Sequence, residues 1–148
     1  MTDILEWICK AARVSLAWFL LGGCNEAPRP VRLPTFPVTG TLYVNGEPAV
    51  GAMVKFHDPS RSGRTAAASV KDDGSFAASF YGVEDGVPAG EYRLLILWMA
   101  PPPGGGLPVD RLNGRFADPA RPVRTVKIVQ GETHLGPIDL TLPDSGNK

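Results

Sequence analysis

Seven short segments between residues 38 and 142 alternate apolar and polar side chains, and turn-forming residues separate them. A period of two places every second side chain on the same face of a strand, whereas a helix repeats about every 3.6 residues. The segments are 38–44, 52–57, 65–70, 75–81, 91–99, 123–129 and 135–142. Many short strands joined by frequent turns are typical of an antiparallel β-sandwich, so we predict an all-β fold of seven strands.

Two turn signals set the expected connections between these strands. In Asn45-Gly46 both residues tolerate a positive φ angle, which is the requirement of a tight hairpin turn. The sequence Lys71-Asp72-Asp73-Gly74 indicates a second hairpin, between segments 65–70 and 75–81. The side chains expected to face the core are Val38, Gly40, Leu42, Val44, Val54, Phe56, Val126, Ile128, Ile138, Leu140 and Leu142.

Segment 91–99 is apolar on both faces. Such a strand is covered on both sides, or one of its faces meets a partner. Trp98 and Met99, late in this strand, are therefore candidates for an apolar partner patch, although core packing is the default for such residues. An exposed edge strand is another place where a partner strand could pair.

Residues 101–122 are longer than an ordinary connection and begin with three prolines and three glycines. Loops of this length tend to be functional or disordered. We expect a mobile Pro/Gly half, followed by a more ordered part in which Phe116 packs against the sandwich.

The N-terminal segment has the layout of a secretory signal. Lys10 and Arg13 precede a short apolar run, 14–21, and small residues follow it. The run is too short to span a bilayer, which needs about 20 apolar residues. Both cysteines, Cys9 and Cys24, lie in this region, so the body of the protein has no disulfide.

Leu21-Gly22-Gly23-Cys24 resembles the lipobox of bacterial lipoproteins. The resemblance implies that residues 1–23 form a signal helix that is removed, and that Cys24 becomes the lipidated first residue. It also implies a membrane anchor of acyl chains such as palmitate, in the cell envelope at the outer membrane or on the periplasmic face. Residues 24–37 are rich in proline, which favours an extended, semi-rigid tether.

Three motifs of the body resemble carboxypeptidase-regulatory-like domains. They are the opening 38–56, the turn Lys71-Asp72-Asp73-Gly74-Ser75-Phe76, and the strand entry Val87-Pro88-Ala89-Gly90-Glu91-Tyr92. Arg115-Phe116-Ala117-Asp118-Pro119 is similar to the ending found in lipoprotein members of that family. The resemblance implies a transthyretin-like (prealbumin-like) domain over 38–142, with 143–148 as a tail. The family has no shared catalytic residues, so the resemblance implies none here.

Residue types alone leave two metal sites to consider. His57, His134, Tyr43, Tyr81 and Tyr92 supply the ligand types of iron-dependent ring-cleaving dioxygenases, but the close His-x-His pair of those enzymes is missing. The acids at 72–73 and 84–85 supply oxygen ligands of the kind that Ca²⁺ binds, but two solvated acidic turns are the favoured explanation for them. We therefore expect no metal, no cofactor and no catalytic residue.

The balance of charge excludes one class of partner. Lys plus Arg and Asp plus Glu number 15 each, so no basic excess favours nucleic acid. We predict a non-enzymatic envelope lipoprotein whose sandwich is a scaffold or protein-interaction module. The alternative is a module at the cell surface that binds carbohydrate or another small molecule through the loops at one end. The expected partners are the membrane, through the anchor, and an envelope protein or a carbohydrate.

Overall fold

The computed structural model describes residues 31–61 and 63–143. One compact unit begins at Leu33. Within the described ranges there are only strands, turns and loops, and no helix that could cross a membrane. The predicted signal segment 1–23, the lipidation site Cys24 and the tail from residue 144 lie outside the described residues.

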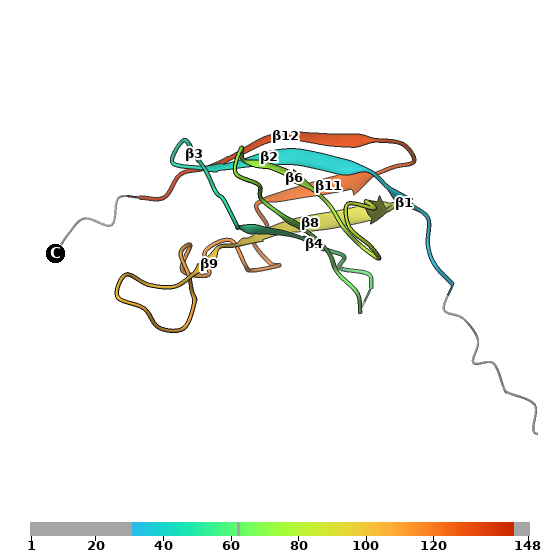
Figure 1. Ribbon diagram of the computed structural model, residues 1–148. Helices are drawn as coiled ribbons and strands as arrows, with labels where there is room; N and C mark the ends of the chain where they lie inside the picture. Colours follow the sequence, from blue (N-terminus) through green and yellow to red (C-terminus); the bar gives the residue numbers. More distant parts are fainter. Residues whose placement is uncertain (1–30, 62, 144–148) are drawn as a thin grey trace, which may run out of the picture. The chain divides into compact units, whose positions relative to one another are not determined.

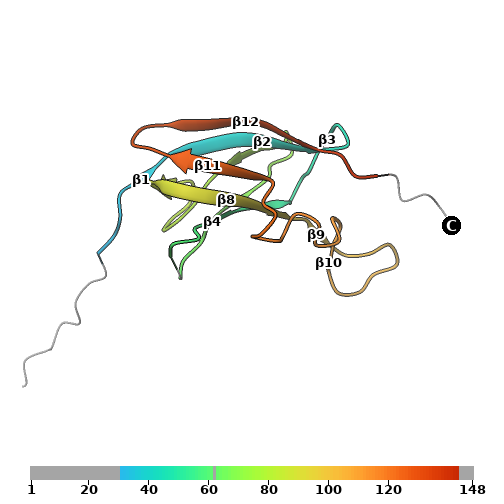
Figure 2. The same cartoon turned by 180° about the vertical axis from the view of Figure 1, so that it is seen from behind.

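Two sheets face each other and enclose the core (Figures 1 and 2). The first sheet has the order β11 (Arg124–Ile128), β8 (Gly90–Leu97), β4 (Met53–His57) and β5 (Ala66–Ser69). The second has β12 (Thr133–Leu140), β2 (Val38–Val44) and β3 (Glu47–Pro48), and β6 (Ser75–Ala77) also pairs with β2. The all-β sandwich predicted from the sequence is confirmed, and each predicted segment overlaps one of the strands longer than two residues.

One strand pair departs from the antiparallel pattern. β12 runs parallel to β2, whereas the other strand pairs of the described residues are antiparallel. The reason is that β11 and β12, although adjacent in sequence, belong to different sheets and form no hairpin with each other. The connection at 129–132 carries the chain across the edge of the sandwich and leaves β12 beside β2.

The turn at 71–74 forms as predicted, but the strands on either side of it separate. Gly74 N–H donates to the Lys71 carbonyl at 2.9 Å, and Gly74 has a φ of 84°. β5 then pairs with β4 in one sheet, while β6 pairs with β2 in the other. The two sides of the expected hairpin are joined by the bridge between Ala67 and Ser79 and, beside the turn, by the Lys71 N–H, which donates to the Ser75 carbonyl at 2.8 Å. This segment therefore closes one side of the sandwich instead of extending one sheet.

The core follows the alternation of the sequence. In β2 the buried positions are 38, 40, 42 and 44, and the positions between them are half-buried. Phe56 and Tyr92 are both buried and make an edge-to-face contact with ring centroids 6.3 Å apart. The Tyr92 hydroxyl donates to the Pro88 carbonyl at 2.9 Å, so its polar atom is satisfied. Phe76 lies against Gly40, where a side chain would leave no room for the ring.

The folded unit starts within the segment that the sequence assigned to the tether. β1 (Thr35–Phe36) pairs antiparallel with β7 (Val87–Pro88). Gly86 has a φ of 89°, and a Cβ at this position would come within 2.1 Å of the Phe36 carbonyl oxygen. The close approach of the two backbones at this glycine brings the chain entering the domain against the loop before β8.

The long loop between β8 and β11 is built onto the sandwich. β9 (Met99–Ala100) and β10 (Val109–Asp110) pair with each other. Beyond β10, Leu112 is buried and Phe116 packs against the core, as predicted. The Phe116 carbonyl accepts from Ile96 N–H at 2.8 Å, beyond the point where β11 stops pairing with β8. The loop before β11 thus supplies a hydrogen-bond partner to the part of β8 that β11 does not reach.

Candidate partner-binding site

The candidate site lies at the end of the sandwich where β8 passes into the long loop. We call residues 98–111 the arm; β9 and β10 form its base, and the loop between them extends beyond the sheets (Figures 1 and 2). The arm adjoins the β2–β3 turn and the last described residues of the chain through a shared pocket. Segments distant in sequence therefore contribute to one surface.

Asp110 organises the base of the arm. Its Oδ1 atom accepts from the backbone N–H of Trp98 at 2.9 Å and of Leu112 at 3.1 Å. Its Oδ2 atom accepts from the N–H of Gly114 at 2.8 Å. Burial opposes ionisation of this carboxyl, but the three N–H groups outweigh it and hold the pKa of Asp110 below its ordinary value. One ionised side chain thus joins β8 to the turns after β10.

Trp98 and Arg111 stack on each other next to Asp110. The Arg111 Cζ atom lies 4.0 Å from the centroid of the Trp98 ring, which is a cation–π stack. The Trp98 indole N–H donates to the Val50 carbonyl at 3.0 Å, and Arg111 N–H donates to the Trp98 carbonyl at 2.8 Å. The indole is therefore held at both its face and its edge, which makes Trp98 a rigid part of the surface.

An apolar groove runs along the arm. Its volume is about 360 Å³, and it is lined by Ala100, Pro101, Pro102, Pro103, Val109 and Arg111. Nearby on the arm, Met99 and Val109 are each 52% exposed and Leu107 is 87% exposed. A group of exposed apolar side chains beside polar ones is a common mark of an interaction surface.

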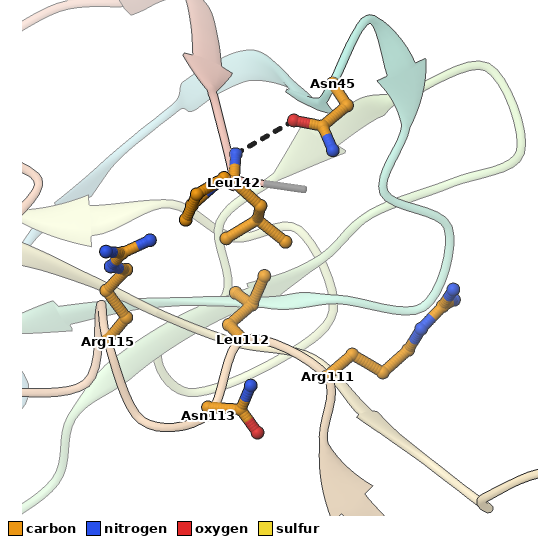
Figure 3. A pocket seen from close by; sticks show the side chains of 7 residues that line it. Asn45, Arg111, Leu112, Asn113, Arg115 and Leu142 are labelled. Carbon is orange, nitrogen blue, oxygen red and sulfur yellow. Dashed lines mark hydrogen bonds between the residues drawn. The ribbon is translucent and has the colours of Figure 1, made fainter. Parts of the chain in front are cut away.

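A second hollow, of about 350 Å³, also has Arg111 in its lining (Figure 3). Leu112 and Leu142 lie toward each other at its centre, and the side chains of Arg111 and Arg115 lie on opposite sides of them. Asn45, whose Oδ1 atom accepts from Leu142 N–H at 2.8 Å, forms part of the wall. Asn113 and Pro143 complete the lining. The pocket is thus apolar in the middle and positively charged at its sides.

The β12 edge of the second sheet offers less to a partner strand. The β12–β2 register shifts between His134 and Pro137, where Gly136 has a φ of 67°. Pro137 has no N–H, and the Leu135 carbonyl already accepts from the Arg124 guanidinium at 2.8 Å. Bulges and prolines are the devices that protect edge strands from pairing. The structure therefore favours the arm over the β12 edge as an interaction site.

The residue types of an iron site are not brought together. His57 is on β4 of the first sheet, and His134 is on β12 of the second. The His134 Nδ1 atom is hydrogen-bonded to the Thr39 hydroxyl at 2.9 Å, and Tyr92 is part of the core. In the described ranges, no three His, Cys, Asp or Glu side chains lie in a group able to hold a metal ion.

The acids considered for Ca²⁺ have local partners. Glu84 pairs with Lys71 at 2.8 Å, and Asp73 accepts from both the N–H and the hydroxyl of Ser75. Asp85 accepts from the N–H groups of Phe80 and Tyr81, which lower its pKa against the opposing effect of burial. These side chains thus stabilise local turns.

Sequence reasoning found part of this site. Trp98 and Met99 were identified by the apolar run of segment 91–99, and Met99 is indeed exposed. Asp110, Arg111 and Arg115 were missed. The run Asp110-Arg111-Leu112-Asn113-Gly114 contains a turn signal that could have indicated an ordered loop, but nothing local connects it to Asn45 or Leu142.

No family model matches the sequence, and no curated protein matches it. Among solved structures, a DUF3823 family protein from Parabacteroides merdae ATCC 43184 is 17% identical, with a TM-score of 0.39 over 74% of this chain and 47% of that one. A 9R-lipoxygenase from Cyanothece PCC8801 is 16% identical, with a TM-score of 0.38 over 77% of this chain and 18% of that one. The chain thus spans about half the length of the first and about a fifth of the second.

Proposed function

We propose that this chain is a non-enzymatic lipoprotein of the bacterial cell envelope, whose transthyretin-like sandwich is a scaffold or protein-interaction module. The partner binds at the arm. The sandwich holds the arm away from the chain entry at Thr35, which is on β1, and a lipid on Cys24 anchors the whole chain. The resemblance to lipoproteins and to carboxypeptidase-regulatory-like domains supports this assignment.

The observation that carries the proposal is the combination of order and exposure in the arm. Asp110, Trp98 and Arg111 hold one another in place, yet Met99 and Val109 remain half exposed. A rigid surface loses little conformational entropy on binding, because its side chains are already ordered. Trp and Arg are also the residue types that contribute most to binding at protein interfaces. An ordered arm with exposed apolar side chains is what a protein-interaction module needs.

Site-specific crosslinking in the native envelope tests the interaction. A photo-crosslinking amino acid replaces Val109 on the arm in one strain, and Val83 in the β6–β7 loop in a second strain. Val83 is the matched control, since it is also a valine and is 91% exposed. We expect a defined crosslinked product from position 109 and none from position 83. Equal products from both positions, or none from position 109, would contradict the proposal.

Replacing Cys24 tests the anchor. We expect Cys24→Ser to move the protein from the membrane fraction to the soluble fraction and to remove the mass of the acyl chains. The matched control is Cys9→Ser, which lies within the predicted signal and leaves both properties unchanged. Unchanged fractionation and mass in Cys24→Ser would rule out lipidation at this residue.

The pocket beside Arg111 supports a second function, the binding of carbohydrate or another small molecule at the cell surface. A hollow of about 350 Å³ lies at the lower end of the range of ligand pockets. Saturation-transfer NMR with a panel of oligosaccharides tests it. Transfer to a sugar from the wild-type protein, reduced in Arg115→Gln, would favour this function over the first.

A further inference from the structure

Arg111 belongs to both hollows of the candidate site. It lines the apolar groove of the arm and also the pocket that Leu112 and Leu142 form. A ligand that follows the surface from one hollow to the other therefore passes this guanidinium. Because Arg111 is stacked on Trp98, its charge is held in a defined position.

The charge of this surface has one sign. The described residues that line the two hollows include Arg111 and Arg115 and no acidic side chain. Neither arginine makes an ion pair with an acid of the described residues. Asp110, which precedes Arg111 in the chain, lines neither hollow, and its two oxygens accept hydrogen bonds from backbone N–H groups. The guanidinium donors of this surface thus remain available to a ligand.

The surface between the charges is apolar. Leu112 and Leu142 form the centre of the pocket, and three prolines with Val109 line the groove. The side-chain oxygen of Asn45 is used by Leu142, which leaves its N–H₂ group available as a donor. The ligand that complements this pattern carries apolar groups, hydrogen-bond acceptors and negative charge.

We propose that the groove and the pocket bind an acidic segment of the partner protein, in which Asp or Glu residues flank an apolar side chain. This inference rests on the proposed function and defines the chemistry of the partner. The apolar side chain lies on Leu112 and Leu142, the carboxylates lie against Arg111 and Arg115, and a peptide carbonyl accepts from Asn45. Complementary charge of this kind selects partners and speeds their encounter.

Selection from a phage-displayed library of random peptides tests the inference without a known partner. The full-length chain, in detergent, is the target. We expect selected peptides to be enriched in Asp or Glu next to Leu, Ile, Val or Phe. Binding of a selected peptide to the wild type and to variants is then measured by fluorescence anisotropy.

Three variants define the role of the arginines. Arg115→Gln is expected to weaken binding of a selected peptide about two- to fivefold, because an exposed charge pair contributes little. The double variant R111Q/R115Q is expected to weaken it about tenfold or more. Lys127→Gln removes the same charge from an exposed position on β11 and is expected to leave affinity unchanged.

Several results would overturn the inference. They are selected peptides without acidic residues, equal binding by wild type and R111Q/R115Q, and equal weakening by Lys127→Gln and Arg115→Gln. Displacement of the peptide by an oligogalacturonate at a lower concentration than by free peptide would assign the pocket to carbohydrate instead. If these tests fail while the crosslinker at position 109 still captures a protein, the proposal of an acidic segment is wrong. The proposal of a protein-interaction module is then retained. If the peptide-binding tests fail and position 109 also gives no crosslinked product, both the acidic segment and the interaction module are ruled out.

Discussion

The carboxylate of Asp110 accepts a hydrogen bond from the backbone N–H of Trp98 at 2.9 Å, across 12 residues of chain. This contact ties the end of the central strand β8 to the far side of the arm. The same carboxylate also binds the N–H groups of Leu112 and Gly114. Several consequences of this relationship can be measured.

Asp110→Ala is expected to destabilise the sandwich. The change leaves the partly buried Trp98 N–H without its partner, and losing hydrogen bonds to a charged group costs about 1.5–3 kcal/mol of unfolding free energy. Urea denaturation followed by circular dichroism measures the loss. The control is Asp118→Ala, because Asp118 makes a similar turn contact to Ala120 N–H at an exposed site. Equal losses in the two variants would mean that Asp110 has no special role in the arm.

The contribution of Asp110 should depend on pH. The pKa of its carboxyl is lower in the folded state than its ordinary value of 3.8, so the ionised form stabilises the fold above that value. The stabilisation is lost as the pH falls through the folded-state pKa. We therefore expect the difference in urea midpoint between wild type and Asp110→Asn to be largest near neutral pH and to shrink in acid. A difference that is constant with pH would contradict this role.

Gly86→Ala is expected to break the pairing of β1 with β7. The new methyl group would lie 2.1 Å from the Phe36 carbonyl oxygen, which is backbone and cannot move away alone. Gly51→Ala is the matched control, since Gly51 has a φ of 77° but no atom within 4 Å of the new methyl group. The control should lose about 1–2 kcal/mol from its backbone conformation, and Gly86→Ala about 3 kcal/mol or more. Similar losses in thermal or urea unfolding would show that the close approach of the two backbones is unimportant.

Gly40→Ala is expected to disturb the core through Phe76. A methyl group at position 40 would lie 2.6 Å from the tip of the Phe76 ring, so the ring must shift. Overpacking of this kind costs about 1–3 kcal/mol. Phe76→Leu shortens the side chain, and the double variant should lose less stability than the sum of the two single changes. A double-mutant cycle that is additive would show that the two positions are not in contact.

The sequence predicted much of the fold because strand periodicity is a local property. The alternation in 38–44 places Val38, Leu42 and Val44 in the core, as observed. The Asn45-Gly46 turn was predicted from its residue types, and both residues have positive φ angles in the structure. The sequence also placed Phe116 against the core. In each case the evidence lies within a few neighbouring residues.

The sequence did not predict which of the two sheets each strand joins. The Lys71–Gly74 turn predicted that the flanking strands form one hairpin, whereas β5 and β6 pair in different sheets. The parallel pairing of β12 with β2 likewise has no local signal. Both arrangements depend on which apolar faces meet across the core, and turn residues contain no information about that choice.

The sequence by itself determined the strands, their buried faces and the tight turns of this protein. It also identified Trp98 and Met99 as candidates for a partner patch. Only the tertiary structure brought Arg111 and Arg115 beside Asn45 and Leu142, two residues that are 97 positions apart and joined by one hydrogen bond. The physical reason is that alternation along a strand follows from local backbone geometry, whereas a pocket forms where separate segments pack, and that packing depends on the whole chain.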